Sequence, residues 1–280
     1  SDSNFCWSSI VNHFIFFTTF IVKLKIENSL IVIESHNKKY LTVVKRDDHF
    51  ITNDGKIFYN DITSIPSTII SSTGNEYLIY TPTYKEFVLL MRRGPQIIYP
   101  KDVGSILMDG NIRNNSKVLE IGTGSGALTL FLILILGNDG KLFSLDSDKK
   151  NQYRASKTIE RYISSLNTEH DFNLELIENE LINFSITDIP EDIDTIITDV
   201  PEPWEFFLKN EIQNEISWVS YLPSISQVQK LTNVLKDNNF KNIEIKENLE
   251  RYWIAKDNIL RPKNEMVGHT GFIVSSRYII

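Results

Sequence analysis

The segment VLEIGTGSGALT, residues 118–129, decides the fold class. It follows a β-rich run and precedes a long apolar run of helical character, which places its glycines in a strand–turn–helix context. Glycine lets the backbone approach a ligand without a Cβ in the way, and the first turn of a helix offers unpaired N–H groups. The segment therefore predicts a cofactor-binding turn. As G-x-G-x-x-A it fits both a methyl-donor site and a dinucleotide site.

Strand-like and helical runs alternate around this turn. Apolar runs such as KVLEI, GKLFSLD and IDTIITD are separated by helical runs such as GALTLFLILIL and KKNQYRASKTIERYISSL. This order predicts an α/β fold with a parallel, doubly wound sheet. KNIEIKENL and TGFIVSSRYI have no helical run between them, which predicts an antiparallel hairpin of these two strands at the sheet edge. That ending is typical of the class I methyltransferase fold, which we expect over residues 83–280.

Short β-like runs fill residues 21–82. They are rich in β-branched and aromatic residues and are separated by the turns ENS, SHNK, RDD, TNDG and STGN. This spacing predicts a small N-terminal all-β domain that resembles a barrel. Residues 1–20 are apolar but diluted by Ser, Asn, His and Thr, so a loose extension or an added strand is favoured over a membrane anchor.

Composition and charge limit the function classes. The 280 residues suffice for one large and one small domain. Cys6 is the only cysteine, which excludes a disulfide framework and indicates a reducing, cytoplasmic location. The five histidines lack metal-ligand spacing, so we expect no metal. The net charge of −7 conceals a basic segment, since residues 85–117 hold six Lys and Arg against three acids. That segment leaves room for a nucleic-acid partner.

Carboxylates after the predicted strands distinguish the two cofactor classes. Glu120 precedes Gly122 by two residues, where it suits the ammonium group of S-adenosylmethionine (SAM) but would repel the phosphates of a dinucleotide. Asp146, after the second strand, is placed to accept hydrogen bonds from the ribose hydroxyls of either cofactor. Glu180 is a weaker candidate for the adenine edge, and Asn151 is a further cofactor candidate. The pattern favours SAM.

The segment DVPEPW, residues 199–204, ends the fourth predicted strand. That strand neighbours the first in this topology, so Asp199 should emerge at the carboxyl edge of the sheet, where ligands of open α/β folds bind. Many methyltransferases that act on amino groups of bases carry a related Asp/Asn-Pro-Pro-aromatic motif there. The prolines would fix the backbone while the carboxylate holds an amine. The alternative is a stiff turn without chemistry.

Five segments together carry a family resemblance. With LLMRRGPQIIYPKDVGSIL, LEIGTGSGALT, DVPEPW, YLPSISQVQKL and LRPKNEMVGHTGFIV, the chain resembles the tRNA adenine-58 N1-methyltransferases of the bacterial and archaeal single-subunit kind. The resemblance runs from about residue 21 to the C-terminus. It implies methyl transfer from SAM to N1 of adenine 58 in the T-loop of tRNA by a homotetramer. The adenine N1 lone pair is itself the nucleophile, so the enzyme must flip the base and align it.

The resemblance also implies residue roles. Asp199 matches a catalytic aspartate that accepts the N6 proton, and Tyr99 matches an aromatic residue that stacks on the target base. Trp204 would either wall the pocket or pack in the core. The implied cofactor-binding residues are Gln96, Ile98, Glu120, Gly122, Gly124, Ser125, Gly126, Ala127, Leu128, Asp146, Asn151, Glu180 and Asp199. The implied phosphate contacts are Arg92, Arg93, Lys101, Arg261 and Lys263.

Some positions depart from the family pattern or lack a derived role. Glu202 stands where the family usually has Asp or a small apolar residue, and we expect it to face solvent. Glu265 stands where a basic residue is common, and LKNEIQNEIS replaces a usual glycine pair. His269 and Thr270 lie in a family-like stretch, where a packed, hydrogen-bonded histidine is favoured over a chemical one.

Three other functions stay open at this point. The first is a SAM-dependent methyltransferase for another RNA adenine or for a protein carboxylate. The second is a non-catalytic tRNA-binding subunit of a two-subunit enzyme, although the intact Glu120, Asp146 and Asp199 argue against a lost cofactor site. The third is a nicotinamide oxidoreductase, which the acid at residue 120 disfavours.

Overall fold

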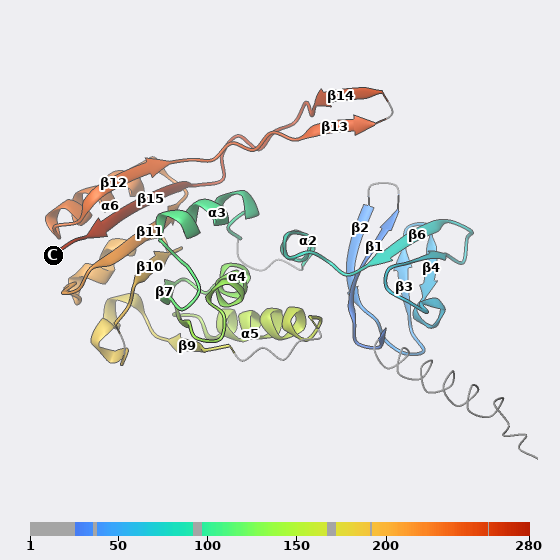
Figure 1. Ribbon diagram of the computed structural model, residues 1–280, viewed down its shortest axis with the longest axis horizontal. Coiled ribbons are helices and arrows are strands. Elements are labelled where there is room, and N and C mark those ends of the chain that lie inside the picture. Colours follow the sequence, from blue (N-terminus) through green and yellow to red (C-terminus); the bar gives the residue numbers. More distant parts are fainter. Residues whose placement is uncertain (1–25, 36–37, 92–96, 167–171, 191, 257) are drawn as a thin grey trace, which may run out of the picture. The chain divides into compact units, whose positions relative to one another are not determined.

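The computed structural model describes residues 26–35, 38–91, 97–166, 172–190, 192–256 and 258–280 (Figure 1). The described residues group into two compact units, one made of those up to 91 together with 161–166, the other of the remainder. The predicted extension, residues 1–20, lies outside the described residues. Within the described ranges, no helix is both long and apolar enough to span a bilayer.

The N-terminal unit is built on antiparallel strands. Four of them form a sheet in the order β2-β1-β6-β5, made of Lys38–Val43, Leu30–Ser35, Glu76–Tyr80 and Ser67–Ile70. A separate hairpin pairs β3 (His49–Thr52) with β4 (Gly55–Phe58), and the 3-10 helix η1 covers Tyr59–Asp61. The predicted small all-β domain is confirmed in these strands.

Alternation along β6 shows how the N-terminal unit forms its core. Tyr77 and Ile79 point inward and are almost fully buried, whereas Leu78 between them is exposed. Side chains on a strand alternate between its two faces, so every second residue reaches the core. The Tyr77 hydroxyl shares a buried hydrogen bond of 2.9 Å with Thr52, which satisfies its polar end.

Helix α2 (Tyr84–Leu90) belongs to the N-terminal unit. It begins with a capping box in which Thr83 and Glu86 bond each other's backbone N–H, the arrangement that satisfies the free donors of a first helical turn. The domain boundary predicted between residues 82 and 83 falls before this helix, whereas the compact unit includes it.

The second unit carries a seven-stranded sheet in the order β12-β15-β11-β10-β7-β8-β9 (Figure 1). Strands β7 to β11 run parallel, and β15 inserts antiparallel between β11 and β12. This is the predicted class I methyltransferase fold, which is confirmed. The strands in this sheet order cover Lys241–Lys246, Phe272–Tyr278, Ile216–Leu222, Thr195–Thr198, Lys117–Ile121, Lys141–Asp146 and Leu174–Glu178.

Helices cover both faces of this sheet. Trp218 and Leu222 of β11 belong to the apolar cluster that includes α6, whereas Tyr221, of opposite parity, hydrogen-bonds to Asp102 of α3. Since alternate side chains of a strand face opposite sides, α3 and α6 lie on opposite faces. The helices are α3 (Pro100–Asp109), α4 (Ala127–Leu136), α5 (Lys149–Ile163) and α6 (Ile225–Asp237), with the 3-10 helices η2 (Leu181–Asn183), η3 (Ile186–Asp188) and η4 (Pro203–Leu208).

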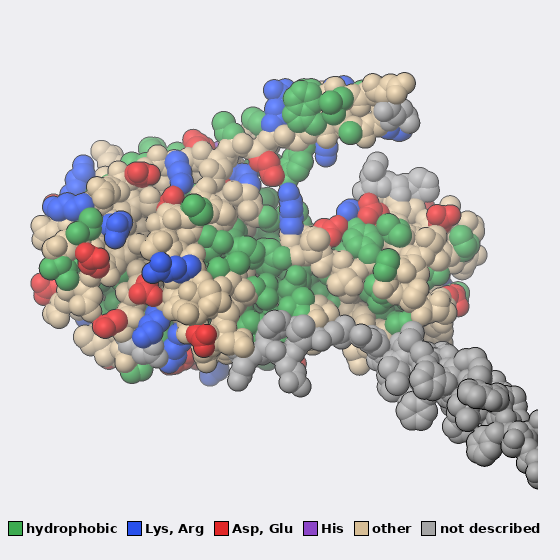
Figure 2. Space-filling view, in the orientation of Figure 1, with side chains coloured by type: hydrophobic (Ala, Val, Ile, Leu, Met, Phe, Trp, Pro, Cys, Tyr) green, Lys and Arg blue, Asp and Glu red, His purple; other side chains and the backbone are tan. Residues whose placement is uncertain are grey.

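An arm that the sequence reasoning missed leaves the sheet between β12 and β15. It contains a two-stranded hairpin of β13 (Trp253–Lys256) and β14 (Ile259–Pro262), seen at the end of the extended chain in Figure 1. We call residues 249–268 the C-terminal arm. Its side chains are largely exposed, and blue and green atoms lie side by side on it in Figure 2. The antiparallel pairing of the last two sheet strands is as predicted, with β12 at the edge.

Candidate functional site

The glycine turn joins β7 to α4 at the carboxyl edge of the sheet. Gly122, Gly124 and Gly126 all have φ in the left-handed region, at 105°, 53° and 76°. A Cβ on Gly122 would collide with the backbone carbonyl of Asp199, and one on Gly126 would come within 2.8 Å of Ala155 of α5. Glycine is therefore required by backbone conformation and by close packing at the same positions.

Glu120 lies directly beneath this turn with 1% of its surface exposed. Its Oε2 accepts hydrogen bonds from Thr129 at 2.7 Å and from Ser144 at 2.6 Å. Its buried Oε1 has no partner within the described part of the chain. Burial, reinforced by the charges of Asp199 and Asp146, raises the pKa of this carboxyl group to about 8. An orphaned buried carboxylate oxygen suits a cationic group of a ligand.

Asp146 is oriented by the same turn. Its Oδ2 accepts a hydrogen bond of 2.9 Å from the N–H of Gly124, and its Oδ1 accepts one of 2.8 Å from the N–H of Asp148. Asn151 approaches both oxygens at 3.4 and 3.5 Å. The carboxylate therefore has a fixed direction at the mouth of the site, as a group that binds a ribose would need.

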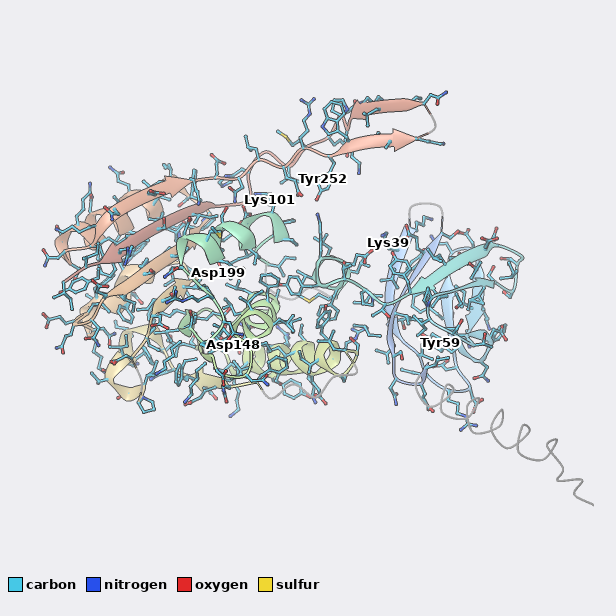
Figure 3. The ribbon with its side chains drawn as sticks, in the orientation of Figure 1. Lys39, Tyr59, Lys101, Asp148, Asp199 and Tyr252 are labelled. Atoms are coloured by element: carbon cyan, nitrogen blue, oxygen red, sulfur yellow. The ribbon has the colours of Figure 1, made fainter. Side chains whose placement is uncertain are left out.

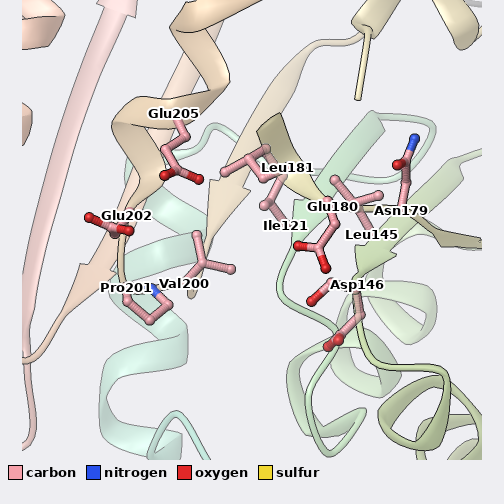
Figure 4. A pocket seen from close by; sticks show the side chains of 11 residues that line it. Ile121, Leu145, Asp146, Asn179, Glu180, Leu181, Val200, Pro201, Glu202 and Glu205 are labelled. Atoms are coloured by element: carbon pink, nitrogen blue, oxygen red, sulfur yellow. The ribbon is translucent and has the colours of Figure 1, made fainter. Parts of the chain in front are cut away.

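A cavity of about 180 Å³ opens beside Asp146 (Figure 4). Glu180 lies in its wall, whereas Asn151 does not. The sequence did not predict the apolar residues in the cavity wall. Apolar residues at the ends of buried strands are common, so nothing in the sequence marks these as part of a site. Glu202, expected to face solvent, is exposed and also lines this open cavity. The lining residues are Ile121, Leu145, Asp146, Ser147, Asn179, Glu180, Leu181, Val200, Pro201, Glu202 and Glu205.

Asp199 follows β10 at the same edge. Its N–H donates to the carbonyl of Ile121 at 2.8 Å, which ties the elbow to the glycine turn. The side chain reaches solvent, yet it sits in a recess crowded by protein atoms, and this loss of water raises the pKa of its carboxyl group to about 7. Figure 3 labels Asp199 at this edge of the sheet.

The end of the DVPEPW elbow and the 3-10 helix η4 that follows it pack into the core. Phe206 of η4 is fully buried, and Phe207 stacks on Trp218 with 5.0 Å between ring centroids. Trp204 packs against the same core, and the ammonium of Lys230 lies 4.0 Å from its ring centroid. Trp204 therefore takes the core-packing alternative.

Tyr99 is the residue immediately before α3. Pro100 occupies the first helical position, and the Tyr99 carbonyl accepts the N–H of Asp102 at 2.8 Å. Ile98 is buried. Gln96, Arg92 and Arg93, the other predicted site residues of this stretch, lie outside the described residues.

Lys101 corrects one expectation. Its ammonium donates to Asp102 at 2.8 Å, to the carbonyl of Asn248 at 2.8 Å and to Thr270 at 2.6 Å. Only 9% of the side chain is exposed. An ammonium has three hydrogens, and these acceptors occupy them, so the geometry contradicts a phosphate contact by Lys101.

The other described RNA candidates lie on the C-terminal arm. Arg261 and Lys263 are exposed, Arg261 reaching Asn264 at 3.4 Å and Lys263 lying 5.5 Å from the ring centroid of Tyr252. His269 at the base of the arm hydrogen-bonds to Glu247 and to the carbonyl of Pro223. His269 is hydrogen-bonded, as the sequence favoured, but it is exposed rather than packed.

A family model described as "tRNA methyltransferase complex GCD14 subunit" matches residues 76–260. The chain belongs to this family. The tRNA (adenine(57)-N(1)/adenine(58)-N(1))-methyltransferase TrmI of Methanocaldococcus jannaschii is 32% identical over 268 residues, 88% of this chain and 94% of that one. A tRNA (adenine(58)-N(1))-methyltransferase TrmI of Thermus thermophilus is 27% identical over 237 residues, 80% and 89% of the two chains.

A solved structure agrees with these relatives. The tRNA (m1A58) methyltransferase TrmI of Aquifex aeolicus superposes with a TM-score of 0.76 at 26% identity, covering 91% of this chain and 98% of that one. The resemblance to this methyltransferase family, inferred from the five segments, is thereby confirmed. The nicotinamide oxidoreductase alternative is set aside. Among the described residues, no group of three or more His, Cys, Asp or Glu could hold a metal ion.

Proposed function

We propose that this chain methylates N1 of adenine 58 in the T-loop of tRNA, with SAM as the methyl donor. One observation carries the proposal: Glu120 keeps a buried, unpartnered Oε1 at the edge of the sheet where Asp199 follows β10. A buried acid without a partner fits the ammonium of SAM and would repel the pyrophosphate of a dinucleotide. The names of the TrmI relatives supply the base and its position.

The residues around the turn fit the whole cofactor. Glu120 would accept the ammonium, Asp146 the ribose hydroxyls, and Glu180 in the cavity wall the exocyclic amine of the adenine. The cofactor would lie along the backbone of the glycine turn, which comprises Gly122, Gly124, Ser125, Gly126, Ala127 and Leu128. When bound, SAM supplies an electrophilic methyl group on its sulfonium.

The base side of the reaction falls to Asp199 and Tyr99. N1 of a flipped adenine attacks through its lone pair, and the adenine gains a positive charge that weakens the N6–H bond. Asp199 would accept a hydrogen bond from N6–H and then take the proton. Because its side chain is exposed, the proton can pass from it to solvent. Tyr99 would stack on the flipped base and hold N1 in line.

The proposed tRNA contacts come from the C-terminal arm and from residues identified in the sequence alone. Arg261 and Lys263, together with Arg92 and Arg93, would contact phosphates. We also propose a homotetramer, since an acidic protomer with a confined basic strip would benefit from combining several such strips on one tRNA; light scattering measures this directly. The cytoplasmic location predicted from the lone cysteine accompanies this proposal.

A second target is supported by one relative. The Methanocaldococcus jannaschii protein, 32% identical, is named for adenines 57 and 58. Adenine 57 is therefore a candidate substrate here as well. Another RNA adenine or a protein carboxylate stays an alternative, as does a non-catalytic tRNA-binding subunit, which would not bind SAM.

The test is mass spectrometry of tRNA after incubation with the protein and isotopically labelled SAM. We expect label in 1-methyladenosine at residue 58 of tRNA transcripts and no label at that position when adenine 58 is replaced by guanine. A parallel transcript with guanine at 57 reports on the second target. Label confined to bases other than adenines 57 and 58, or SAM binding without any transfer to tRNA, would overturn the proposal.

A further inference from the structure

An ion pair is buried where α3 begins. Lys101 lies 2.8 Å from Asp102, and their side chains are 9% and 0% exposed. Figure 3 labels Lys101 at this end of the helix. Removing two opposite charges from water is unfavourable, so a buried pair is weak evidence for added stability. The surroundings of the pair indicate what else it does.

The partners of this pair come from both ends of the C-terminal arm. On the outgoing side, Asn248 accepts from Lys101 through its carbonyl and donates through its side chain to Asp102 at 3.1 Å. On the returning side, Thr270 accepts from Lys101 and donates to Asp102 at 2.8 Å. One ion pair therefore holds both Asn248, just before the arm, and Thr270, just after it.

The pair also touches the base side of the site. The hydroxyl of Tyr221 donates to Asp102 at 3.3 Å, and the ring of Tyr221 packs so closely on Gly271 that a Cβ there would collide with it. The charges of Asp102 and Asp199 both act on the Tyr221 hydroxyl. On the other side, the N–H of Asp102 holds the carbonyl of Tyr99.

We propose that Asp102 and Lys101 are positioning residues for methyl transfer, which hold Tyr99 in place by fastening both ends of the C-terminal arm to the start of α3. The inference rests on the proposed function, in which Tyr99 stacks on the target base. A shift of the arm is then transmitted to Tyr99 through residues 248 and 270. Binding of tRNA by the arm and alignment of the target base are therefore coupled.

The same helix offers a matched control. At its other end Asp109 forms an ion pair of 2.6 Å with Lys246 of β12. That pair joins α3 to the sheet and touches neither the arm's ends nor Tyr99. Asp109→Asn therefore removes an ion pair from α3 without removing the fastening of the arm.

The experiment measures single-turnover methyl transfer to tRNA and SAM affinity, at a temperature where every variant is folded. Asp102→Asn should lower the rate roughly 10–100-fold, the range expected when a reacting group is misplaced by about 1 Å. SAM affinity should stay unchanged, and Asp109→Asn should keep the wild-type rate. The double variant Lys101→Met/Asp102→Asn, which removes both charges, should recover thermal stability but not the rate.

A second background separates positioning from a general loss of structure. If Asp102 acts through Tyr99, adding Asp102→Asn to Tyr99→Ala should cause no further loss of rate. Losses that multiply would overturn the inference, as would a double charge-neutral variant that turns over like wild type. If Asp102→Asn acted only on stability, it would lower the melting temperature but would not change the methyl-transfer rates compared here.

A readout without tRNA keeps the inference separate from the proposed function. Asp102→Asn should speed amide hydrogen exchange both in residues 99–106 and at the arm's ends, whereas Asp109→Asn should not. If wild type methylates no tRNA, the proposed function fails and the exchange result still decides the coupling. If wild type methylates tRNA and exchange rises at only one of the two places, the coupling fails alone.

Discussion

The backbone carbonyl of Asp199 occupies the space that a Cβ on Gly122 would need. The N–H of Asp199 also donates to Ile121, one residue before that glycine. The cofactor turn and the acid that would receive the substrate's proton are thus packed backbone against backbone. A disturbance of one displaces the other.

Gly122→Ala should therefore damage both halves of the site. The left-handed φ of 105° strains any residue with a Cβ, by about 1–3 kcal/mol, and the collision adds to it. We expect a lower melting temperature, weaker SAM binding by calorimetry and a slower single turnover. Gly104 in α3 is the control, because open space surrounds its would-be Cβ, and Gly104→Ala should stabilise by about 0.5–1 kcal/mol.

Asp146→Ala tests the ribose acid. It would remove two charge-assisted hydrogen bonds to the cofactor, each worth about 1.5–3 kcal/mol, and would also free the N–H of Gly124. SAM affinity should fall at least about tenfold, without any gain of NAD binding. The neighbouring Asp148→Ala removes the acceptor for the N–H of Lys150, so it should lower the melting temperature but not the affinity. Unchanged calorimetric affinity in Asp146→Ala would mean that the ribose lies elsewhere.

Glu120→Gln should change how stability depends on pH. Burial raises the pKa of Glu120 from 4.5 to about 8 in the ligand-free chain. Between these two pH values the folded state therefore keeps a proton on Glu120 that the unfolded state has lost. The stabilisation is complete below pH 4.5 and is lost as the pH rises through about 8. The amide cannot ionise, so the variant's melting temperature should fall less between pH 5 and pH 8.

The same acid links SAM binding to proton release. To pair with the ammonium, Glu120 must be ionised, so binding near pH 7 should expel a proton from the wild-type chain. Calorimetry in buffers of different ionisation enthalpy counts that proton. Glu120→Gln should bind SAM more weakly and release none from this site. A wild-type binding enthalpy independent of the buffer would contradict the pairing.

The sequence predicted the centre of the site better than its surroundings, for a physical reason. Gly122 and Asp199 lie at strand ends whose glycine and proline chemistry is local, so their places follow from neighbouring residues. Lys101 reads as a surface charge because the residues that bury it, Asn248 and Thr270, are far away in the chain. The hairpin of the C-terminal arm has two strands of four residues with no core of their own, so it leaves little periodic signal.

Arg261→Ala and Lys263→Ala test the arm as an RNA-binding surface. Each should weaken tRNA binding about equally for all sequences and reduce the slope of log affinity against log salt by about one, as expected for a lost phosphate contact. SAM affinity should not change. Lys236→Ala, an exposed lysine on α6, is the matched control. Binding curves and salt slopes that equal the control would remove these two residues from the interface.

Asp199→Asn tests the elbow itself. The amide keeps the shape of the side chain but cannot take a proton, so SAM binding and the melting temperature should survive. General-base and electrostatic contributions of this kind are worth roughly 10²–10⁴ in rate, and we expect at least a hundredfold loss in single-turnover methyl transfer.

The pH profile adds a second readout for Asp199. Because the crowded recess raises the pKa of its carboxyl group to about 7, the wild-type rate at saturating SAM and limiting tRNA should fall as the pH drops below 7, and Asp199→Asn should lose this acidic limb. Tyr99→Ala should also be slower, through lost base stacking of about 1–3 kcal/mol, with Tyr99→Phe milder and the acidic limb kept in both. Wild-type rates in Asp199→Asn would reduce DVPEPW to a stiff turn, since nothing but the charge would have changed.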